Sequence, residues 1–318
     1  PFWLKFPAWS PMPFSVVLDD PDEAAEWRQF LDDIPVAIIA KRDALQSRAQ
    51  SLADTLPPLK QKLELDIVVS GCGFMVLYYL GAHSILAILR DRGCVTLCRF
   101  IGASSGAKTP IHLLLAGESL TLDHHLAYAE MCERRGGSTL HAACRNDRCA
   151  RITIQHLVEK VWRREGWQRL DLSAAFLCVT KLTWSGPRRL VLPATSSDVC
   201  NPAAAATALA ERWHATGTLL TWIESYGWCS DGALCGNSCD SLGKALGKTP
   251  SRPQLHCDPQ RSKKIPRRMV FNYTMAEALE AVRAGQDDAL ALLTRVGTGG
   301  ELPLHAGDGA LSLVVATE

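Results

Sequence analysis

The chain has 318 residues, of which 47% are hydrophobic and 21% are charged, and its formal net charge is +1. This length suffices for one large α/β domain or two modest ones, and the apolar share allows a substantial core. Few charges of balanced sign exclude an intrinsically disordered chain. A net charge near zero gives no global field that would attract nucleic acid, so any attraction to an anionic membrane must come from a local patch.

The N-terminal region predicts an arm followed by two helices, together spanning residues 1–60. Residues 1–19 carry one Lys and no Arg among recurring Pro and aromatic residues, which favours an extended arm over a signal peptide. Residues 20–23, Asp-Pro-Asp-Glu, are a helix start, and this helix is expected to end near residue 33. A second helix is expected over 36–56, where the Pro pair that follows stops it.

The segment from residue 65 to residue 117 indicates a βαβα unit. A buried strand is expected over 65–69, a turn over 70–73, a helix over 74–92 and a second strand over 95–101. This order is typical of a mostly parallel central sheet with helices on both faces. Residues 67–89 contain no Asp, Glu, Lys or Arg and are long enough to cross a bilayer, but the glycine turn favours a strand followed by a buried helix.

The rest of the chain predicts further helices and a short hairpin. Helices are expected over 118–170 and 203–210, and two strands over 176–180 and 189–192 flank a turn at 184–187. Residues 61–240 are thus expected to form the α/β core. The last segment, 241–318, is expected to complete the domain, with a basic surface loop over 241–268 and an amphipathic helix over 274–295.

Three short segments have residues suited to acyl transfer. Gly102-Ala103-Ser104-Ser105-Gly106 follows a predicted strand and precedes a helix, which is the context of a nucleophile elbow. Gly71-Cys72-Gly73 lacks the third glycine of a dinucleotide fingerprint, because Val76 stands there. It is either a plain tight turn between strand and helix or an anion cradle of backbone amides, and in acyl transfer that anion would be the oxyanion. In Ser230-Asp231-Gly232-Ala233, a carboxylate placed against a serine hydroxyl can act as a general base without histidine.

In this order the three segments resemble the patatin-like phospholipases, over about residues 65–240. Gly71-Cys72-Gly73-Phe74 followed by Tyr78-Tyr79-Leu80-Gly81 looks like the GCGF variant of the animal-type members, and GASSGA is similar to the family's GASAGA. Ser104 follows Gly73 by 31 residues, close to the family's spacing. The resemblance implies a three-layer α/β fold and a serine lipid acyl hydrolase, of phospholipase or acylglycerol lipase type.

By matching position, the resemblance implies Ser104 as the nucleophile and Asp231 as the base of a Ser–Asp dyad. It implies oxyanion amides at Gly71, Cys72 and Gly73, with Gly102, Gly106 and Gly232 supporting the motifs. No metal or organic cofactor is expected. The implied partners are a glycerolipid or phospholipid substrate and a membrane or lipid surface, with no nucleic acid. An intracellular, peripheral location is expected, including a mitochondrial or plastid one after removal of a transit peptide.

Departures from the family pattern support an alternative, in which the chain is a catalytically degenerate structural subunit of a larger, possibly membrane-bound assembly. Val76 stands where a glycine is usual and is expected to press on the oxyanion turn. Lys108 replaces an apolar residue, and Pro110 removes one helix bond near the elbow. Met75 and Ala233 are further departures.

Other residues were considered for metal, triad and surface roles. The spacing of Cys229, Cys235 and Cys239 does not match a zinc site, and neither does that of His141, Cys144 and Cys149. His83 and His112 are set aside as triad bases, and His124-His125 is expected to be a polar helix start. The basic run 261–268 is either a lipid headgroup contact or a solvated loop. Trp3, Trp9 and Trp184 are candidates for an exposed interface. The twelve cysteines favour buried thiols in a reducing compartment.

Overall fold

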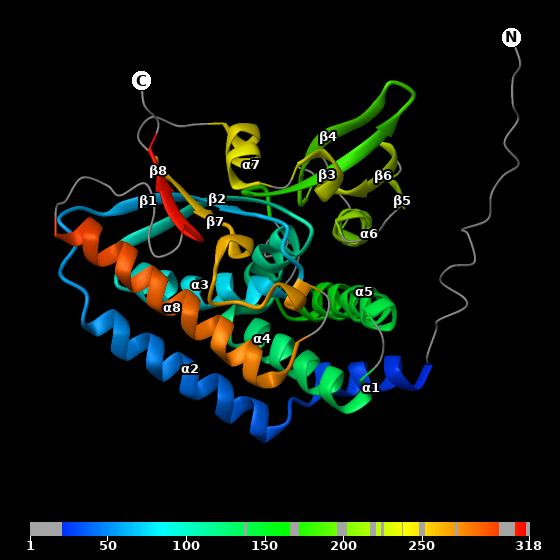
Figure 1. The fold of residues 1–318 in the computed structure, drawn as a ribbon. Coiled ribbons are helices and arrows are strands. Elements are labelled where there is room, and N and C mark those ends of the chain that lie inside the picture. The colour runs from blue at the N-terminus through cyan, green and yellow to red at the C-terminus, as the bar shows by residue number, and fades with distance from the viewer. Residues whose placement is uncertain are drawn as a thin grey trace, which may run out of the picture.

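The computed structural model describes residues 21–136, 139–165, 172–195, 202–216, 221–223, 226–236, 238–247, 252–270, 273–298 and 309–315. The arm expected at 1–19 lies outside the described residues, and so do Trp3 and Trp9. The described residues form one mixed β-sheet with helices on both of its faces (Figure 1). The prediction of a layered α/β fold is therefore confirmed.

The sheet has a parallel centre and antiparallel edges. Its central strands β3, β2, β1 and β7 are parallel, and β4, β5, β6 and β8 pair antiparallel at the two sides. The strand order is β5-β6-β3-β2-β1-β7-β8, with β4 also paired to β3. The strands are β1 Leu63–Val69, β2 Val95–Ala103, β3 Ala175–Thr183, β4 Gly186–Pro193, β5 Thr221–Ile223, β6 Gly227–Asp231, β7 Gln254–Cys257 and β8 Leu311–Val314.

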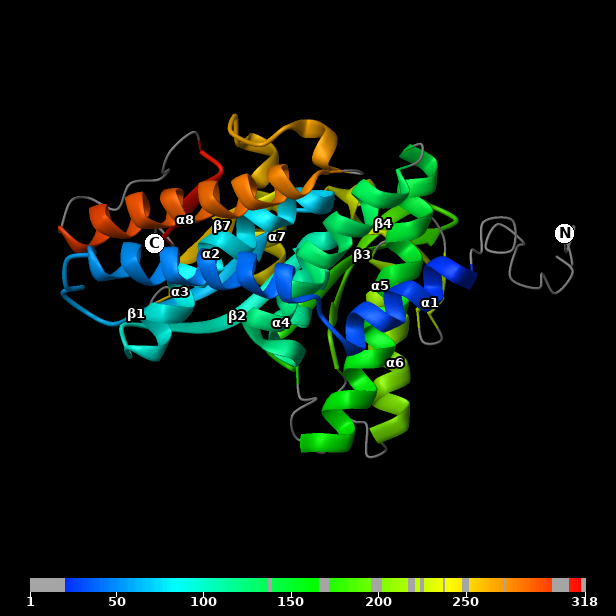
Figure 2. The ribbon, with the colours of Figure 1, turned by 90° about the horizontal axis from the view of Figure 1, so that it is seen from below.

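Most helices cover one face of the sheet, and α7 packs on the other (Figure 1). Seen from below, α2 and α8 run side by side, and α5 lies beside α6 (Figure 2). The α-helices are α1 Pro21–Asp32, α2 Val36–Asp54, α3 Leu77–Asp91, α4 Ser105–Arg135, α5 Thr139–Glu165, α6 Pro202–Ala215, α7 Cys239–Leu246 and α8 Met275–Gly297. Short 3-10 turns are η2 Gly73–Val76, η4 Gly232–Cys235, η5 Pro259–Arg261 and η6 Arg267–Val270.

Helix α3 lies in the middle of the helical layer, as its uncharged sequence predicts. Together with η2 it forms a segment, Gly73–Asp91, that is long and apolar enough to cross a bilayer, but 78% of the tested window is buried inside the protein. Gly81 lets α8 approach closely, because a methyl group there would lie 1.9 Å from the Val282 carbonyl oxygen. The Tyr78 hydroxyl donates a hydrogen bond to the Asp288 carboxylate of α8 at 2.7 Å. Burial against the helices therefore accounts for this apolar segment.

The expectation of a surface loop over residues 241–268 is wrong. This segment contains the end of α7 and strand β7, whose four residues are all buried between β1 and β8. The polar residues of β7 interrupt the apolar run by which a buried strand is recognised in a sequence. They are satisfied internally: Gln254 Nε2 donates to the Gly243 carbonyl at 3.1 Å, and His256 Nε2 lies 3.1 Å from Gln254 Oε1. The sheet thus extends well past residue 240.

Candidate active site

Strands β2 and β6 reach one edge of β3 from opposite directions and meet there. Ala103, the last residue of β2, is paired with Cys178, and Asp231, the last residue of β6, is paired with Val179. Strand β4 occupies the other edge of β3, so the two strand ends lie at consecutive positions along one edge. Ser104 directly follows Ala103. The register therefore brings Ser104 and Asp231 to the same point of the sheet.

The turn after Asp231 packs against the end of β2. A methyl group on Gly232 would lie 2.3 Å from the Cys178 carbonyl oxygen and 3.2 Å from Ala103 Cβ. Only glycine allows this approach. The Thr180 hydroxyl also donates to the backbone carbonyl of Asp231 at 2.8 Å. These contacts fix the backbone of Asp231 beside the residue that precedes Ser104.

Ser104 is held in a strained elbow between β2 and α4. Its φ is 52° and its ψ is −132°, and no other non-glycine residue in the described part of the chain has a positive φ. Such a conformation costs roughly 1–3 kcal/mol and persists only where the surroundings impose it. The Ser104 carbonyl accepts hydrogen bonds from the amides of Ala107 and Lys108, which starts α4. The residue therefore has the backbone of a nucleophile elbow.

Two glycines make the elbow sterically feasible. A methyl group on Gly102 would lie 2.1 Å from the Gly106 carbonyl oxygen, and one on Gly106 would lie 2.3 Å from the Ser70 carbonyl oxygen. Any side chain at either position would displace backbone. The second contact also shows that the elbow packs directly on the end of β1, where the glycine turn begins.

The glycine turn is braced by the segment after β7. The Ser70 hydroxyl donates to Asp258 at 2.9 Å, and Gln260 Nε2 donates to the Gly71 carbonyl. Gly73 has a φ of 57°, which favours glycine. Residues 258–260 therefore support the turn, and sequence reasoning missed them because they fall in the segment expected to be a surface loop.

One amide of the turn already has a partner. The Cys72 backbone N–H donates to Ser105 Oγ at 3.4 Å, and the Cys72 sulfur lies 3.8 Å from the same oxygen. Burial raises the pKa of the Cys72 thiol to about 12, so this thiol is protonated at neutral pH and is no competing nucleophile. The Ser105 hydroxyl therefore binds one of the three amides that the motif resemblance implies for an oxyanion.

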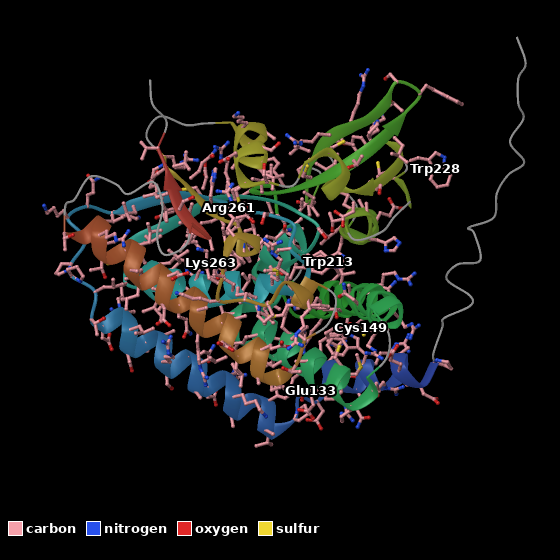
Figure 3. The ribbon with its side chains drawn as sticks, viewed as in Figure 1. Glu133, Cys149, Trp213, Trp228, Arg261 and Lys263 are labelled. Atoms are coloured by element: carbon pink, nitrogen blue, oxygen red, sulfur yellow. The ribbon has the colours of Figure 1, made fainter. Side chains whose placement is uncertain are left out.

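Ser104, Asp231 and Gly71–Gly73 all line one cavity of about 370 Å³. The structure thus brings together the residues that the three motifs singled out. Helices α1, α4, α5 and α6 and the short turns η2 and η5 supply the rest of the described wall. Its largely apolar members include Trp27, Phe74, Val76, Tyr128, Ala150 and Trp213. Figure 3 labels Trp213 on α6 and Cys149, another wall residue, on α5.

Three histidines also line this cavity, although the sequence had assigned them other positions or no role. His112 and His124 are buried, and His112 Nε2 lies 2.9 Å from His124 Nδ1. Burial lowers the pKa of His124 to about 3 and, with His124 and His125 nearby, lowers the pKa of His112 well below its usual value. Burial also lowers the pKa of His125, whose Nδ1 lies 2.9 Å from the Thr121 carbonyl. All three rings are therefore neutral near pH 7.

The expectation that His124-His125 begins a helix is wrong, because both lie inside α4. That helix is broken at Gly117, whose φ is 77° and ψ is 174°. The break turns the second half of α4 back, so that the His112 and His124 rings lie only 5.0 Å apart. On a straight helix, twelve residues would separate them by roughly 18 Å.

The remaining candidates have structural surroundings of their own. His83 is buried on α3 and lies 3.3 Å from the Tyr79 hydroxyl. Pro110 is buried inside α4, which continues past it. Within the described residues, no group of three or more His, Cys, Asp or Glu side chains is placed to hold a metal ion, and all ten described cysteines are free thiols.

The basic run 261–268 is partly neutralised by carboxylates. Arg261 lies 3.2 Å from Asp258, and Lys264 lies 2.7 Å from Asp288 on α8. Arg268 is paired with Glu277. Figure 3 labels Arg261 and Lys263 of this segment. These ion pairs hold the segment against its neighbours. They therefore reduce the positive charge that the segment has available for lipid headgroups.

No model of a known protein family, no curated protein and no solved structure matches this chain. The local geometry and the motif resemblance are therefore the grounds for assigning a function. Both grounds concern the same cavity, which Ser104, Asp231 and the glycine turn line together.

Proposed function

We propose that the chain is a serine lipid acyl hydrolase that cleaves fatty-acyl esters of glycerolipids through a Ser104–Asp231 dyad. The observation that carries the proposal is the meeting of β2 and β6 at consecutive positions on β3. It brings the one non-glycine residue of the described chain with a positive φ beside a carboxylate, on the wall of one cavity. A purely structural turn has no need for that strain.

The proposed reaction proceeds through an acyl-enzyme. Ser104 Oγ attacks the ester carbonyl carbon while Asp231 accepts the hydroxyl proton. The glycine turn and the first amides of α4 stabilise the oxyanion. When the intermediate collapses, the ester C–O bond breaks and the leaving alcohol takes the proton from Asp231. Water then attacks the acyl-enzyme, Asp231 accepts a proton from it, and the fatty acid leaves as Ser104 recovers its hydrogen.

The cavity walls suit an acyl chain more than a polar substrate. Trp27, Phe74, Tyr128 and Trp213 provide apolar surface, and the histidines are neutral there. Removing an acyl chain from water is favourable by roughly 0.8 kcal/mol per CH₂ group. The proposal accordingly includes a lipid substrate presented at a membrane or lipid surface, and it requires no cofactor.

A fluorophosphonate probe tests the nucleophile directly. The wild-type protein should be labelled, and the labelled peptide should contain Ser104. Ser104→Ala should abolish labelling, and Asp231→Asn should slow it strongly because the base is lost. Ser105→Ala distinguishes the two adjacent hydroxyls: it removes the neighbouring one and should still be labelled at Ser104. A folded protein that is not labelled, or that is labelled equally with Ser104→Ala, would refute the proposal.

The alternative function is a non-catalytic subunit that keeps this fold. It is favoured by the hydrogen bond from the Cys72 amide to Ser105 Oγ, because that amide is then partly taken. Lys108, one helical turn after Ser104, adds a charged side chain to the cavity. Under this alternative, ester substrates are not turned over even when the protein is folded and its cavity is open, and the same labelling experiment decides between the two functions.

A further inference from the structure

Exposed apolar side chains gather at one corner of the molecule. Five large hydrophobic residues are exposed in the described chain, and three of them lie on the β3–β4 hairpin or on the adjacent strand β6. Trp184, at the hairpin turn, is 101% exposed, while Trp228 is 47% exposed and Leu182 is 39% exposed. A fully exposed tryptophan loses the large stabilisation that its burial would give. Its exposure beside other apolar side chains therefore indicates a site of interaction with another molecule.

The sheet register places these side chains together. Leu182 of β3 is paired with Pro187 of β4. On the other edge of β3, Lys181 is paired with Cys229, so the same antiparallel register puts Trp228 beside Leu182. Leu182, Pro187 and Trp228 therefore form one row across three strands, with Trp184 beyond it at the turn. The hairpin projects from the body of the protein (Figure 1), and Trp228 lies at the outer side of β6 (Figure 3).

The charges of the hairpin have one sign. Residues 172–195 contain no Asp or Glu, but they include Lys181, Arg188 and Arg189. The Arg188 side chain is exposed and donates to Ser185 Oγ at 2.9 Å, which leaves its charge uncompensated by any residue of the hairpin. Arg189 instead donates to backbone carbonyls of 235–241, so it holds the hairpin base in place. Lys181 and Arg188 are paired with each other one position along the strands from Leu182 and Pro187. They therefore place positive charge on the other face of the same hairpin, close to its turn.

We propose that this corner, formed by the tip of the β3–β4 hairpin and Trp228, docks on the surface of an anionic lipid bilayer. Tryptophan side chains prefer the boundary between headgroups and acyl chains, and a rigid hairpin presents them without a large ordering cost. Lys181 and Arg188 attract anionic headgroups, each by about 1 kcal/mol, or roughly fivefold in affinity. An exposed aromatic tip with basic residues nearby fits an anionic bilayer better than an uncharged bilayer.

Docking would place the candidate active site close to its substrate. Trp228 and Asp231 are in the same strand, three residues apart, which corresponds to about 10 Å. The inference does not depend on catalysis, because lipid binding by the hairpin would persist in Ser104→Ala. Failure of probe labelling and failure of membrane binding are therefore separate results.

Vesicle sedimentation tests the proposal with the full chain. The protein should sediment with vesicles of phosphatidylcholine and phosphatidylserine and bind less to phosphatidylcholine alone. Trp184→Ala combined with Trp228→Ala should reduce binding at least tenfold, and Arg188→Gln should reduce it about fivefold. Val36→Ala is the control, because Val36 is 81% exposed but lies on α2. Circular dichroism should show that every variant is folded.

Three results would overturn the proposal. The wild-type protein could fail to bind either vesicle, or the double tryptophan variant could bind as well as wild type. Light scattering could also show a dimer that the double variant dissociates, which would assign the apolar row to a second copy of the chain. In contrast, a blue shift of tryptophan fluorescence on addition of anionic vesicles, lost in Trp184→Ala, would support it.

Discussion

The buried histidine pair makes the stability of the protein depend on pH in a calculable way. The pKa of His124 is lowered by burial from 6.5 to about 3, and Lys160, together with His125 and His156 when they are protonated, opposes its protonation further. In the unfolded chain the same ring titrates near its ordinary pKa of 6.5. Stability contributed by a neutral His124 is therefore fully present above pH 6.5 and is lost as the pH falls toward 3.

The size of the effect follows from these two pKa values. At pH 5 the unfolded His124 is mostly protonated while the folded one remains neutral. Linkage then lowers the free energy of unfolding by about 2 kcal/mol relative to pH 8. His124→Phe removes the titration and keeps an aromatic ring beside Trp27, whose ring centre lies 6.5 Å from that of His124. The loss of stability between pH 8 and pH 5 should therefore shrink by about 2 kcal/mol in this variant.

Urea unfolding at pH 8 and pH 5, followed by circular dichroism, measures this difference. The absolute stability of His124→Phe is not the readout, because the substitution also removes the hydrogen bond to His112. Tyr128→Phe is the control, because Tyr128 also packs on the Trp27 ring, with ring centres 5.9 Å apart. Burial raises the pKa of Tyr128 far above this pH range, so the pH dependence of this variant should match wild type. Identical pH dependence in wild type and His124→Phe would show that the ring is not buried as described.

Two further substitutions test the elbow and the glycine turn. Gly106→Ala should cost about 3 kcal/mol or more in urea unfolding, because its methyl group would lie 2.3 Å from the Ser70 carbonyl oxygen. Gly93→Ala, at a positive φ with open space around it, should cost only about 1 kcal/mol, and equal costs would contradict the packing argument. Ser105→Ala should speed fluorophosphonate labelling about fivefold by releasing the Cys72 amide. Slower labelling would instead give Ser105 a supporting role.

The central βαβ unit could be predicted from the sequence because its signals are local. The apolar run at 65–69, the glycine turn and the uncharged helix after it correspond to β1, η2 and α3. The Gly-x-Ser-x-Gly segment lies at a strand-to-helix elbow, as its context predicted. The meeting of β2 and β6 on β3 depends on pairing between distant segments, so the sequence offered only the motif resemblance as a guide to it.

Two other features could not be predicted, for different physical reasons. β7 carries buried polar residues that bond to one another and to backbone, so it lacks the apolar signal of a central strand. The histidine pair forms only because Gly117 breaks α4, and a single glycine in a long helical pattern does not reveal the direction of a break. The hairpin turn expected at 184–187 is shorter than that, because β4 already begins at Gly186, and the full exposure of Trp184 follows from its place at the tip.

Strand β3 has a mechanical role that follows from its contacts. Over Cys178–Val179 it sets the spacing between the strand ends that carry Ser104 and Asp231, and five residues later, at Trp184, the same chain reaches the exposed hairpin turn. The strand ends that carry Ser104 and Asp231 are thus joined to the hairpin turn by one continuous strand about 17 Å long, with no loop between them. A displacement of the hairpin tip would therefore change the spacing between Ser104 and Asp231.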